Sequence, residues 1–356
     1  MTEVGAEGAS RPGRRRRHPS AVTIHDVARA AGVAASTVSR TFSLPERVNI
    51  RTREHVREVA ARLNYRPNPA ARALPSGRTT TLGLLVPDIT NPFFFDLIRG
   101  AERQASAAGY TLVLSDTEES PSREARTVAQ LNRAVDGFVL ASSRLSADRI
   151  RELAADNVLV LINRRVAGVP SAVADNTDST RQLVEHLASL GHRRLAYLGG
   201  PRPSWSNAQR WEALQEAARE KELSAVRLGP YPPFMAGGAA AADAAIGSGA
   251  TAVIAFNSLL AIGVLQRCAE RGIRVPGDLS IAGYDDIFGA DFCSPPLTTV
   301  ASPIQDVGRA AVDLLLGQLT THLGRREPHG VTLPCYLRIR ESTGRAPGGE
   351  PSDRAG

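Results

Sequence analysis

The spacing of hydrophobic residues divides the chain into two parts. Before residue 80 the apolar positions follow the period of short helices, whereas after it compact apolar runs alternate with amphipathic helical stripes. The N-terminal part therefore predicts a small all-α domain. The longer C-terminal part predicts an α/β domain in which strands and helices alternate.

The helical pattern opens with four apolar side chains at the i, i+3, i+4, i+7 spacing of one helix face: Ile24, Val27, Ala28 and Ala31. Gly32 follows them, and glycine reaches the positive φ of a sharp corner without a Cβ clash. Residues 35–40 predict a second short helix, and residues 51–63, after the candidate N-cap Asn49, predict a third. This order predicts a helix-turn-helix, although a glycine-cornered hairpin also serves as a plain packing unit.

The second predicted helix has the side chains of a DNA reader. Its early residues are small or hydroxylated, so it fits in a major groove about 12 Å wide, and Arg40 carries a planar fork that pairs with guanine. Charge favours this interpretation over a packing unit. Residues 1–78 hold 15 Arg and 6 acidic residues, net +9, whereas residues 79–356 hold 28 basic and 30 acidic residues, net −2. The concentrated positive charge predicts affinity for a phosphate backbone.

From residue 80 onward, apolar runs are spaced for parallel sheets. The predicted strands cover residues 82–86, 111–115, 136–141, 158–162, 193–199, 251–256 and 279–284. Residues 80–340 exceed one open-sheet domain, so we expect two doubly wound lobes that share several crossovers. Ligands of such folds bind beyond the carboxyl ends of strands, which selects the loops at residues 88–94, 142–145, 163–165, 175–177, 200–210, 257–258 and 284–286.

Several motifs, in their order and spacing, resemble the LacI family of bacterial transcriptional regulators from about Thr23 to Ile339. They are TIHDVARAAGV and STVSR within residues 23–40, TREHVREVAARLNYRPNPAARAL at 52–74, LGLLVPDITNPFF at 82–94, VDGFVL at 135–140, RVPGDLSIAGYDD at 274–286 and PPLTTV at 295–300. The resemblance implies a homodimer that binds a pseudo-palindromic double-stranded DNA operator and responds to a small molecule. It also implies lobes of the periplasmic-binding-protein type, with the effector in the cleft between them.

The resemblance also implies roles for residues of the DNA-binding part. Ala35, Ser36 and Arg40 match positions that read bases. Thr23, Thr37 and Thr52 match positions that contact phosphates and set the register. In the segment 68–74, which resembles the family's hinge helix, Leu74 matches a minor-groove wedge and Ala71 fits the same narrow space. The prolines around this segment also suit a linker that is disordered until DNA is bound.

Seven residues match or adjoin family positions that bind the effector: Phe93, Phe94, Asp175, Asn176, Arg210, Asn257 and Asp285. Trp205 is an eighth candidate on its own chemistry, because an indole in a polar loop without a core to join suits the face of a sugar. The phenylalanines would stack on an effector ring, and Arg210 and Asp285 would bind its polar groups. Each residue type also has a structural use: an aromatic core pair, a salt bridge, a turn-forming aspartate or a tryptophan that caps the lobe. Ser258 stands where many members carry an aspartate, which puts the usual polyol-binding carboxylate in doubt. A carbohydrate effector remains the first expectation.

The sequence contains none of the catalytic motifs that would indicate an enzyme. The single lysine, Lys221, lies between two glutamates, which rules out a phosphate-binding P-loop, and neither G-x-S-x-G nor H-E-x-x-H occurs. No metal site or cofactor is indicated, and three scattered cysteines suit reduced thiols of a cytoplasmic protein. The alternatives are a stand-alone sugar-binding receptor without DNA-directed function, and an enzyme with a cryptic site that turns over its bound molecule.

The predicted organisation has five parts: a disordered basic tail at 1–20, a helix-turn-helix domain at 21–66, a hinge helix or linker at 67–79, a two-lobed effector-binding and dimerisation domain at 80–340, and a disordered tail at 341–356. The first tail lacks the apolar run of a signal peptide or membrane anchor. No leucine heptad follows the lobes, which favours a dimer over a tetramer. We therefore expect a ligand-responsive repressor that is cytoplasmic and associates with the nucleoid when bound to its operator.

Overall fold

The computed structural model describes residues 22–65, 78–320 and 330–348 of the chain. The predictions for the tail at 1–20, for Ala71 and for Leu74 concern residues outside these ranges. The chain forms two compact units, residues 1–79 and 80–356, which are described one at a time.

The first unit is a three-helix domain built around a small apolar core. Its elements are α1 (Ile24–Ala31), α2 (Ala35–Ser43), the 3-10 turn η1 (Pro45–Arg47) and α3 (Ile50–Arg62). Val27, Val38 and Val56 are fully buried, and the predicted stripe of α1 faces this core. Gly32 ends α1 in the left-handed region at φ 66°, as the predicted corner requires.

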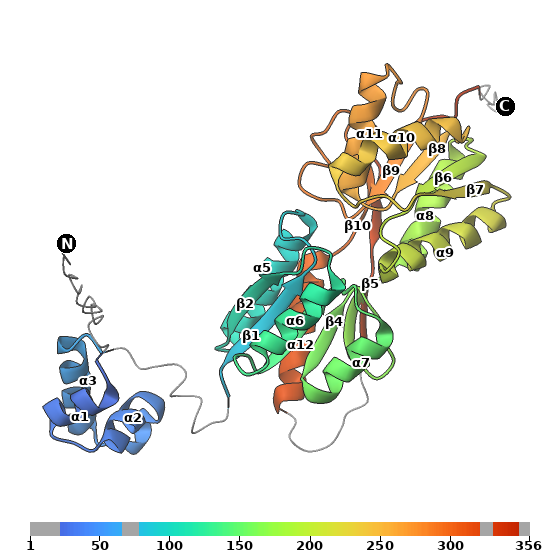
Figure 1. Ribbon diagram of the computed structural model, residues 1–356. Helices are drawn as coiled ribbons and strands as arrows, with labels where there is room; N and C mark the ends of the chain where they lie inside the picture. Colours follow the sequence, from blue (N-terminus) through green and yellow to red (C-terminus); the bar gives the residue numbers. More distant parts are fainter. Residues whose placement is uncertain (1–21, 66–77, 321–329, 349–356) are drawn as a thin grey trace, which may run out of the picture. The chain divides into compact units, whose positions relative to one another are not determined.

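The second unit consists of two α/β lobes (Figure 1). Lobe 1 has a six-stranded sheet in the order β11-β5-β4-β3-β1-β2, with every neighbouring pair parallel. Its strands are β1 (Thr81–Val86), β2 (Thr111–Asp116), β3 (Gly137–Ala141), β4 (Leu159–Ile162), β5 (Ser171–Ala174) and β11 (Gly330–Leu333). Its helices are α5 (Phe93–Ala107), α6 (Pro121–Leu131), α7 (Ala147–Asp156) and α12 (Ile304–Thr320).

Lobe 2 repeats this architecture with the strand order β12-β10-β9-β8-β6-β7, in which only β12 is antiparallel to its neighbour. Its strands are β6 (Arg194–Leu198), β7 (Ser224–Leu228), β8 (Ala252–Ala255), β9 (Ser280–Tyr284), β10 (Thr298–Ala301) and β12 (Tyr336–Arg338). Its helices are α8 (Asn176–Ser189), α9 (Trp205–Glu220), the 3-10 turn η2 (Met235–Gly237), α10 (Gly238–Gly247) and α11 (Ser258–Glu270).

The chain crosses between the lobes three times, from β5 to α8, from β10 to α12 and from β11 to β12. As a result α12 packs in lobe 1 although it follows the last parallel strand of lobe 2 (Figure 1). It lies close to α5, because Gly100 and Gly308 leave no Cβ to keep the two helix backbones apart. The predicted pair of doubly wound lobes with shared crossovers is therefore confirmed.

Two local predictions are wrong. Trp205 does not lie in a loop but is the first residue of α9, which Ser204 caps by accepting a hydrogen bond from the Asn207 amide at 3.2 Å. Residues 341–348, the described part of the segment expected to be a disordered tail, also make contacts with lobe 2. Ser342 is fully buried, and the Ile281 amide donates to its carbonyl oxygen at 2.8 Å. The contacts of this segment are made by small hydroxylated residues, so the sequence has no hydrophobic periodicity that would predict its structure.

The segment of residues 341–346 is also anchored by a buried histidine. His192 Nε2 lies 3.0 Å from the Gly344 carbonyl oxygen, and its Nδ1 lies 2.9 Å from the Thr251 hydroxyl. Since a carbonyl oxygen only accepts, Nε2 carries the hydrogen and Nδ1 accepts from Thr251 in the neutral ring. Burial lowers the pKa of His192 from its ordinary value, which favours that neutral form.

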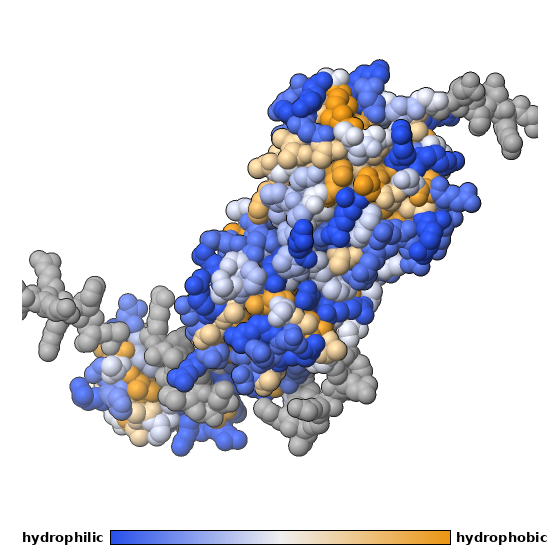
Figure 2. Space-filling view, turned by 45° about the vertical axis from the view of Figure 1, so that its right-hand side comes forward, coloured by the Kyte–Doolittle hydropathy of each residue, from blue (hydrophilic) through white to orange (hydrophobic). Residues whose placement is uncertain are grey.

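Both lobes expose some apolar side chains. In the view of Figure 2, hydrophobic patches lie on both lobes between hydrophilic side chains. Of the large hydrophobic residues that the structure describes, Phe288 and Phe292 are the most exposed, at 78% and 65%. None of the described helices is both long enough and apolar enough to cross a bilayer.

Candidate nucleic-acid interface and ligand cleft

Thr23 begins the helix-turn-helix as the N-cap of α1. Its hydroxyl accepts from the Asp26 amide at 3.3 Å, and the Asp26 carboxylate accepts from the Thr23 amide at 2.9 Å. This reciprocal capping box satisfies two amides that a helix start leaves unpaired. The side chain expected to contact phosphate thus has a structural role in the chain itself. The T-x-x-D spacing of Thr23 and Asp26 is a sequence signal that could have predicted this cap.

The second helix exposes the residues predicted to read bases. Val38 is fully buried on the inner face of α2, while Ser36 and Arg40 are exposed and Ala35 is partly buried. Among the described residues, none forms a hydrogen bond or ion pair with the Arg40 guanidinium, so its donor fork faces solvent. Thr37 and Thr52, the predicted phosphate contacts, are both partly exposed.

The N-terminus of α2 has no side-chain cap. Ala34 occupies the N-cap position with extended backbone angles, φ −67° and ψ 148°, but has no oxygen to offer the first amides. Serine, threonine, aspartate and asparagine are preferred there because their side chains accept from those amides. The helix that carries Arg40 therefore lacks a stabilising contact that α1 and α3 both have.

A cleft between the lobes gathers loops from the carboxyl ends of both sheets. The space between its walls is about 400 Å³, including the part that is open to solvent. Lobe 1 contributes Asn91, Phe93, Phe94, Glu119, Ser142, Arg144 and Asn163, and lobe 2 contributes Ser204, Ser206, Arg210, Pro233, Phe256, Asn257 and Asp285. Six of the seven loops that the strand-end rule selected contribute residues to the cleft, whereas the loop at 175–177 does not.

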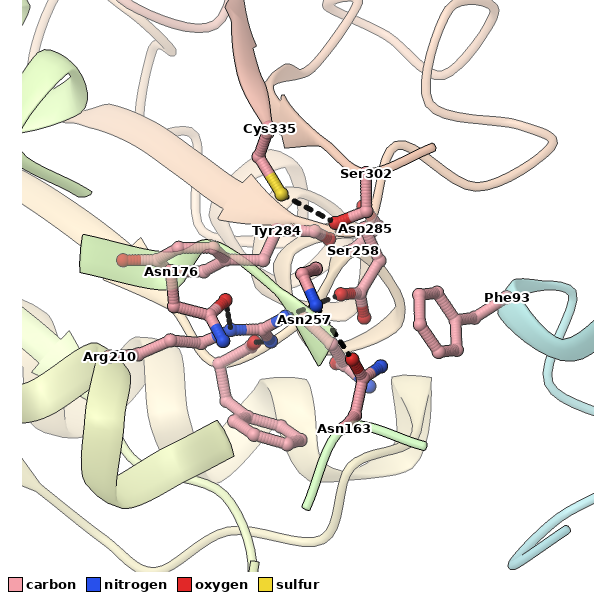
Figure 3. Close-up of polar contacts among 12 residues, drawn as sticks. Phe93, Asn163, Asn176, Arg210, Asn257, Ser258, Tyr284, Asp285, Ser302 and Cys335 are labelled. Atoms are coloured by element: carbon pink, nitrogen blue, oxygen red, sulfur yellow. Dashed lines mark hydrogen bonds and ion pairs between the residues drawn. The ribbon is translucent and has the colours of Figure 1, made fainter. Parts of the chain in front are cut away.

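Arg210 is held by several contacts in the lobe 2 wall of the cleft (Figure 3). Its Nη2 donates to the Asp285 carboxylate at 2.7 Å, its Nη1 donates to the Phe256 carbonyl at 2.5 Å, and its Nε donates to the Asn176 side chain at 3.2 Å. The guanidinium also lies over the Tyr284 ring, 4.2 Å from its centroid. Burial is the largest influence on the pKa of Arg210 and lowers it, but the Asp285 carboxylate together with Tyr197 and Tyr284 outweighs burial, so the pKa is raised.

Phe93 faces this network from lobe 1 (Figure 3). It packs edge-to-face on Phe94 with ring centroids 5.1 Å apart, and both rings are mostly buried while still lining the cleft. The pair therefore serves both uses considered from the sequence, since it is part of the lobe 1 core and an apolar wall of the cleft.

Three predicted effector residues do not line the cleft. Asp175 caps α8 by accepting from the Thr177 amide at 2.9 Å, Asn176 lies behind Arg210, and Trp205 is partly buried at the start of α9. Asn257 does line the cleft, but its side chain caps α11 and donates to the Pro233 carbonyl at 2.9 Å. At these positions the aspartate and asparagine side chains therefore have structural roles: Asp175 and Asn257 cap helices, and Asn176 accepts a hydrogen bond from Arg210.

Two charged residues of the cleft wall were missed. Glu119 and Arg144 form an ion pair in which Arg144 Nε and Nη2 donate to the two carboxylate oxygens at 2.5 and 2.9 Å. Arg144 lies in a loop that the sequence had selected, but no role was given to it. Glu119 follows β2, and extending the strand-end rule to that strand would have found it.

No metal site accompanies these residues. Among the residues that the structure describes, no group of three or more histidines, cysteines or carboxylates is placed to hold a metal ion. The three cysteines, Cys268, Cys293 and Cys335, are free thiols. Cys335 lies in the third crossover and contacts the Ser302 hydroxyl of the second at 3.3 Å (Figure 3).

Comparison with known proteins covers both units. Residues 23–68 match the model of bacterial regulatory proteins of the lacI family, and residues 184–343 match a periplasmic binding protein-like domain. The chain is 32% identical to the HTH-type transcriptional regulator DegA of Bacillus subtilis over 90% of this chain and 98% of DegA.

Two solved structures of regulators are also similar. The lac repressor dimer bound to operator and the anti-inducer ONPF has a TM-score of 0.81 at 26% identity and covers 91% of this chain and 100% of that one. The complex of the transcriptional regulator CelR with cellobiose has a TM-score of 0.67 at 28% identity and covers 90% and 99%.

Proposed function

We propose a function on the basis that the chain belongs to the LacI family of bacterial regulatory proteins. The protein is a repressor that binds an inverted-repeat DNA operator as a homodimer. A small-molecule effector determines whether the dimer stays bound to the operator or dissociates from it. It is a regulator of transcription rather than an enzyme. One observation carries the proposal: a single chain joins an exposed helix-turn-helix to a two-lobed domain whose polar cleft draws residues from both lobes.

We assign base recognition to Ala35, Ser36 and Arg40, and phosphate contacts to Thr37, Thr52 and Thr23. The exposed guanidinium of Arg40 supports this assignment because it has no competing partner among the described residues. For Thr23, a phosphate contact would share the hydroxyl with the capping box. The minor-groove contacts of Ala71 and Leu74 stay predictions. We also keep residues 21–66 as the proposed DNA-binding domain and residues 67–79 as the proposed hinge.

We assign effector binding to the cleft of residues 80–340, with Phe93, Phe94, Arg210, Asn257 and Asp285 as its predicted contacts. The aromatic walls suit the apolar faces of a sugar ring, and the polar wall suits its hydroxyls. Cellobiose in the similar CelR complex supports a carbohydrate effector. Asn176 would act through Arg210, which it holds at 3.2 Å, and Asp175 and Trp205 are the weakest members of the predicted set.

Homodimers need an apolar contact surface, and we assign part of it to Phe288 and Phe292. Their rings lie edge-to-face with centroids 5.0 Å apart while both stay largely exposed in the single chain. Covering such a pair removes apolar surface from water. We expect the dimer to be cytoplasmic, because its DNA target is there, and to be associated with the nucleoid while it is bound to its operator.

Control of DNA binding would follow from the position of the cleft. A ligand that contacts both walls stabilises one arrangement of the lobes over others, and it shifts the operator equilibrium only through that difference in affinity. Such couplings typically amount to about 1–3 kcal/mol. Arg164 of lobe 1 donates to the Pro203 carbonyl of lobe 2 at 3.3 Å, so the lobes contact each other directly beside the lining residues Asn163 and Ser204.

The test is selection of operator sequences from a random duplex library with the full-length protein, followed by a salt titration. We expect an inverted repeat to be enriched and to be bound in preference to a scrambled duplex, with affinity that falls steeply as salt rises. Equal affinity for both duplexes at every salt concentration, with and without candidate sugars, would overturn the proposed function.

A further inference from the structure

The ion pair between Glu119 and Arg144 lies in the lobe 1 wall of the cleft, outside every position to which the sequence assigned a role. Arg144 is 7% exposed and Glu119 is 21% exposed, and both residues line the cleft. Resting on the proposed effector function, we propose that Glu119 is a specificity-determining residue that accepts hydrogen bonds from hydroxyl groups of an uncharged, hydroxyl-rich effector, and that Arg144 is its positioning residue.

The geometry leaves Glu119 with unused acceptor capacity. An ionised carboxylate offers about four lone-pair sites, and the parallel bonds from Arg144 occupy one on each oxygen. The bidentate contact also fixes the plane of the carboxylate. A sugar hydroxyl that enters the cleft therefore meets an acceptor that is already oriented, so little rotamer freedom is lost when it binds.

The backbone of Arg144 is hydrogen-bonded to the buried side chain of Glu124. The Arg144 amide donates to the Glu124 carboxylate at 3.1 Å, and Arg144 Nη1 donates to the Ser142 carbonyl at 3.0 Å. Glu124 is 3% exposed and belongs to α6, so it ties the loop after β3 to a helix of the same lobe. Burial raises the pKa of Glu124, while contacts with Ser143 and Arg144 oppose that rise. Arg144 is thus fixed at its backbone as well as at its guanidinium.

The opposite wall holds a matching pair, Arg210 and Asp285. These two arginines and two carboxylates are the charged residues that line the described cleft, so its formal charge is zero and each cation already has a carboxylate partner. Among the lining residues, a phosphate or carboxylate on the ligand would find no cation without a carboxylate partner, and it would face Glu119 and Asp285. Arg164 is not a lining residue, and its guanidinium donates to the carbonyls of Leu145 and Pro203. A neutral polyol has donors for the carboxylates, which is why the cleft favours it.

The experiment compares matched neutral and phosphorylated sugars in the full-length protein. The probes are D-ribose and D-ribose 5-phosphate, D-glucose and D-glucose 6-phosphate, and cellobiose and cellobiose 6-phosphate, measured by thermal shift and then by calorimetry. We expect at least one neutral probe to bind the wild type in preference to its phosphate. If no neutral probe binds, or if a phosphate binds more tightly, the inference is wrong.

Glu119→Gln is the decisive variant, because it leaves the Arg144 guanidinium without its counter-charge. We expect binding of the neutral probe to weaken about tenfold or more, and the preference for the neutral sugar over its phosphate to fall by a similar factor. Glu118→Gln is the matched control, since Glu118 pairs with Arg123 at 2.5 Å and does not line the cleft. It should leave both affinities unchanged.

A structural salt bridge predicts a different result. If Glu119→Gln only lowers the melting temperature and leaves the selectivity between neutral and phosphorylated probes intact, Glu119 does not contact the effector. The double variant Glu119→Gln, Arg144→Met removes both charges and should not gain phosphate affinity. Should it gain as much as Glu119→Gln, the charge argument fails.

The proposed function is judged separately by duplex binding. The same wild-type protein is assayed on its selected inverted repeat and on the scrambled duplex. Loss of operator preference would overturn the proposed regulator, whereas the inference about Glu119 depends only on the selectivity of the cleft.

Discussion

The guanidinium of Arg210 donates to the carboxylate of Asp285 at 2.7 Å, and the two side chains are only 6% and 8% exposed. Asp285 follows β9 in the connection to β10, and Arg210 lies in the second turn of α9, so the pair joins this connection to α9. Arg210 reaches the Phe256 carbonyl and the Asn176 side chain as well. One side chain thereby fixes the loops that form the lobe 2 wall of the cleft.

Arg210→Met should destabilise the two-lobed unit strongly, because it leaves the Asp285 carboxylate buried and unpaired. Removal of one partner of a buried pair typically costs about 3–5 kcal/mol. Urea denaturation of the full-length protein measures the loss. The double variant Arg210→Met, Asp285→Leu should recover part of it, and a single variant within about 1 kcal/mol of wild type would show that the pair is not the support described above.

Arg40→Ala should remove most of the discrimination between the selected operator and scrambled DNA, a loss of about 1–3 kcal/mol per half-site contact. Sugar binding should not change. Arg62→Ala is the control: Arg62 ends α3 and is exposed, so its loss should weaken binding to both duplexes by the same factor. Competition binding at fixed salt separates the two results, and retained operator preference in Arg40→Ala would refute the assignment of α2 as the recognition helix.

The sequence predicted the parts of the fold that apolar periodicity controls. Compact runs such as residues 82–86 and 251–256 became buried strands, because both faces of a parallel sheet are covered by helices. Strands without such a run were missed. β7 is an edge strand with several exposed residues, and β12 has only three residues.

Buried polar contacts account for the other misses. The first turn of α9 buries Asn207, which accepts from the Tyr197 hydroxyl at 3.0 Å and from the Gly200 amide at 2.9 Å. Its sequence therefore looks like a polar loop. Glu119 and Arg144 were overlooked for the same reason, since a charged residue in a loop is usually solvated and only the fold reveals its buried partner.

Ala34→Ser should stabilise the recognition helix. Serine at the N-cap can accept a hydrogen bond from an amide of the first turn, a gain of about 1 kcal/mol over alanine. Thr23→Ala is the opposite change, because it deletes the cap that α1 already has. Hydrogen exchange followed by mass spectrometry should show slower exchange over α2 in the first variant and faster exchange over α1 in the second. Faster exchange over α2 in Ala34→Ser would contradict the capping argument.

Acid should destabilise the two-lobed unit through His192. Burial lowers the pKa of His192 in the folded protein, so the unfolded chain binds a proton more readily than the folded chain does. The contribution to stability is complete above the ordinary histidine pKa of about 6.5 and is lost as the pH falls below it. His186, which contacts Thr343 and whose pKa burial also lowers, adds to the same trend.

His192→Gln should reduce this pH dependence, although it also lowers stability at neutral pH by disturbing the contacts with Gly344 and Thr251. The measurement is the free energy of unfolding in urea at several pH values between 5 and 8. The exposed His55, in α3 of the other unit, provides the control, and His55→Gln should leave the slope for the two-lobed unit as it is in the wild type. If the free energy of unfolding falls equally in His192→Gln and in the wild type between pH 7 and pH 5, the titration of His192 does not cause the acid destabilisation of the two-lobed unit.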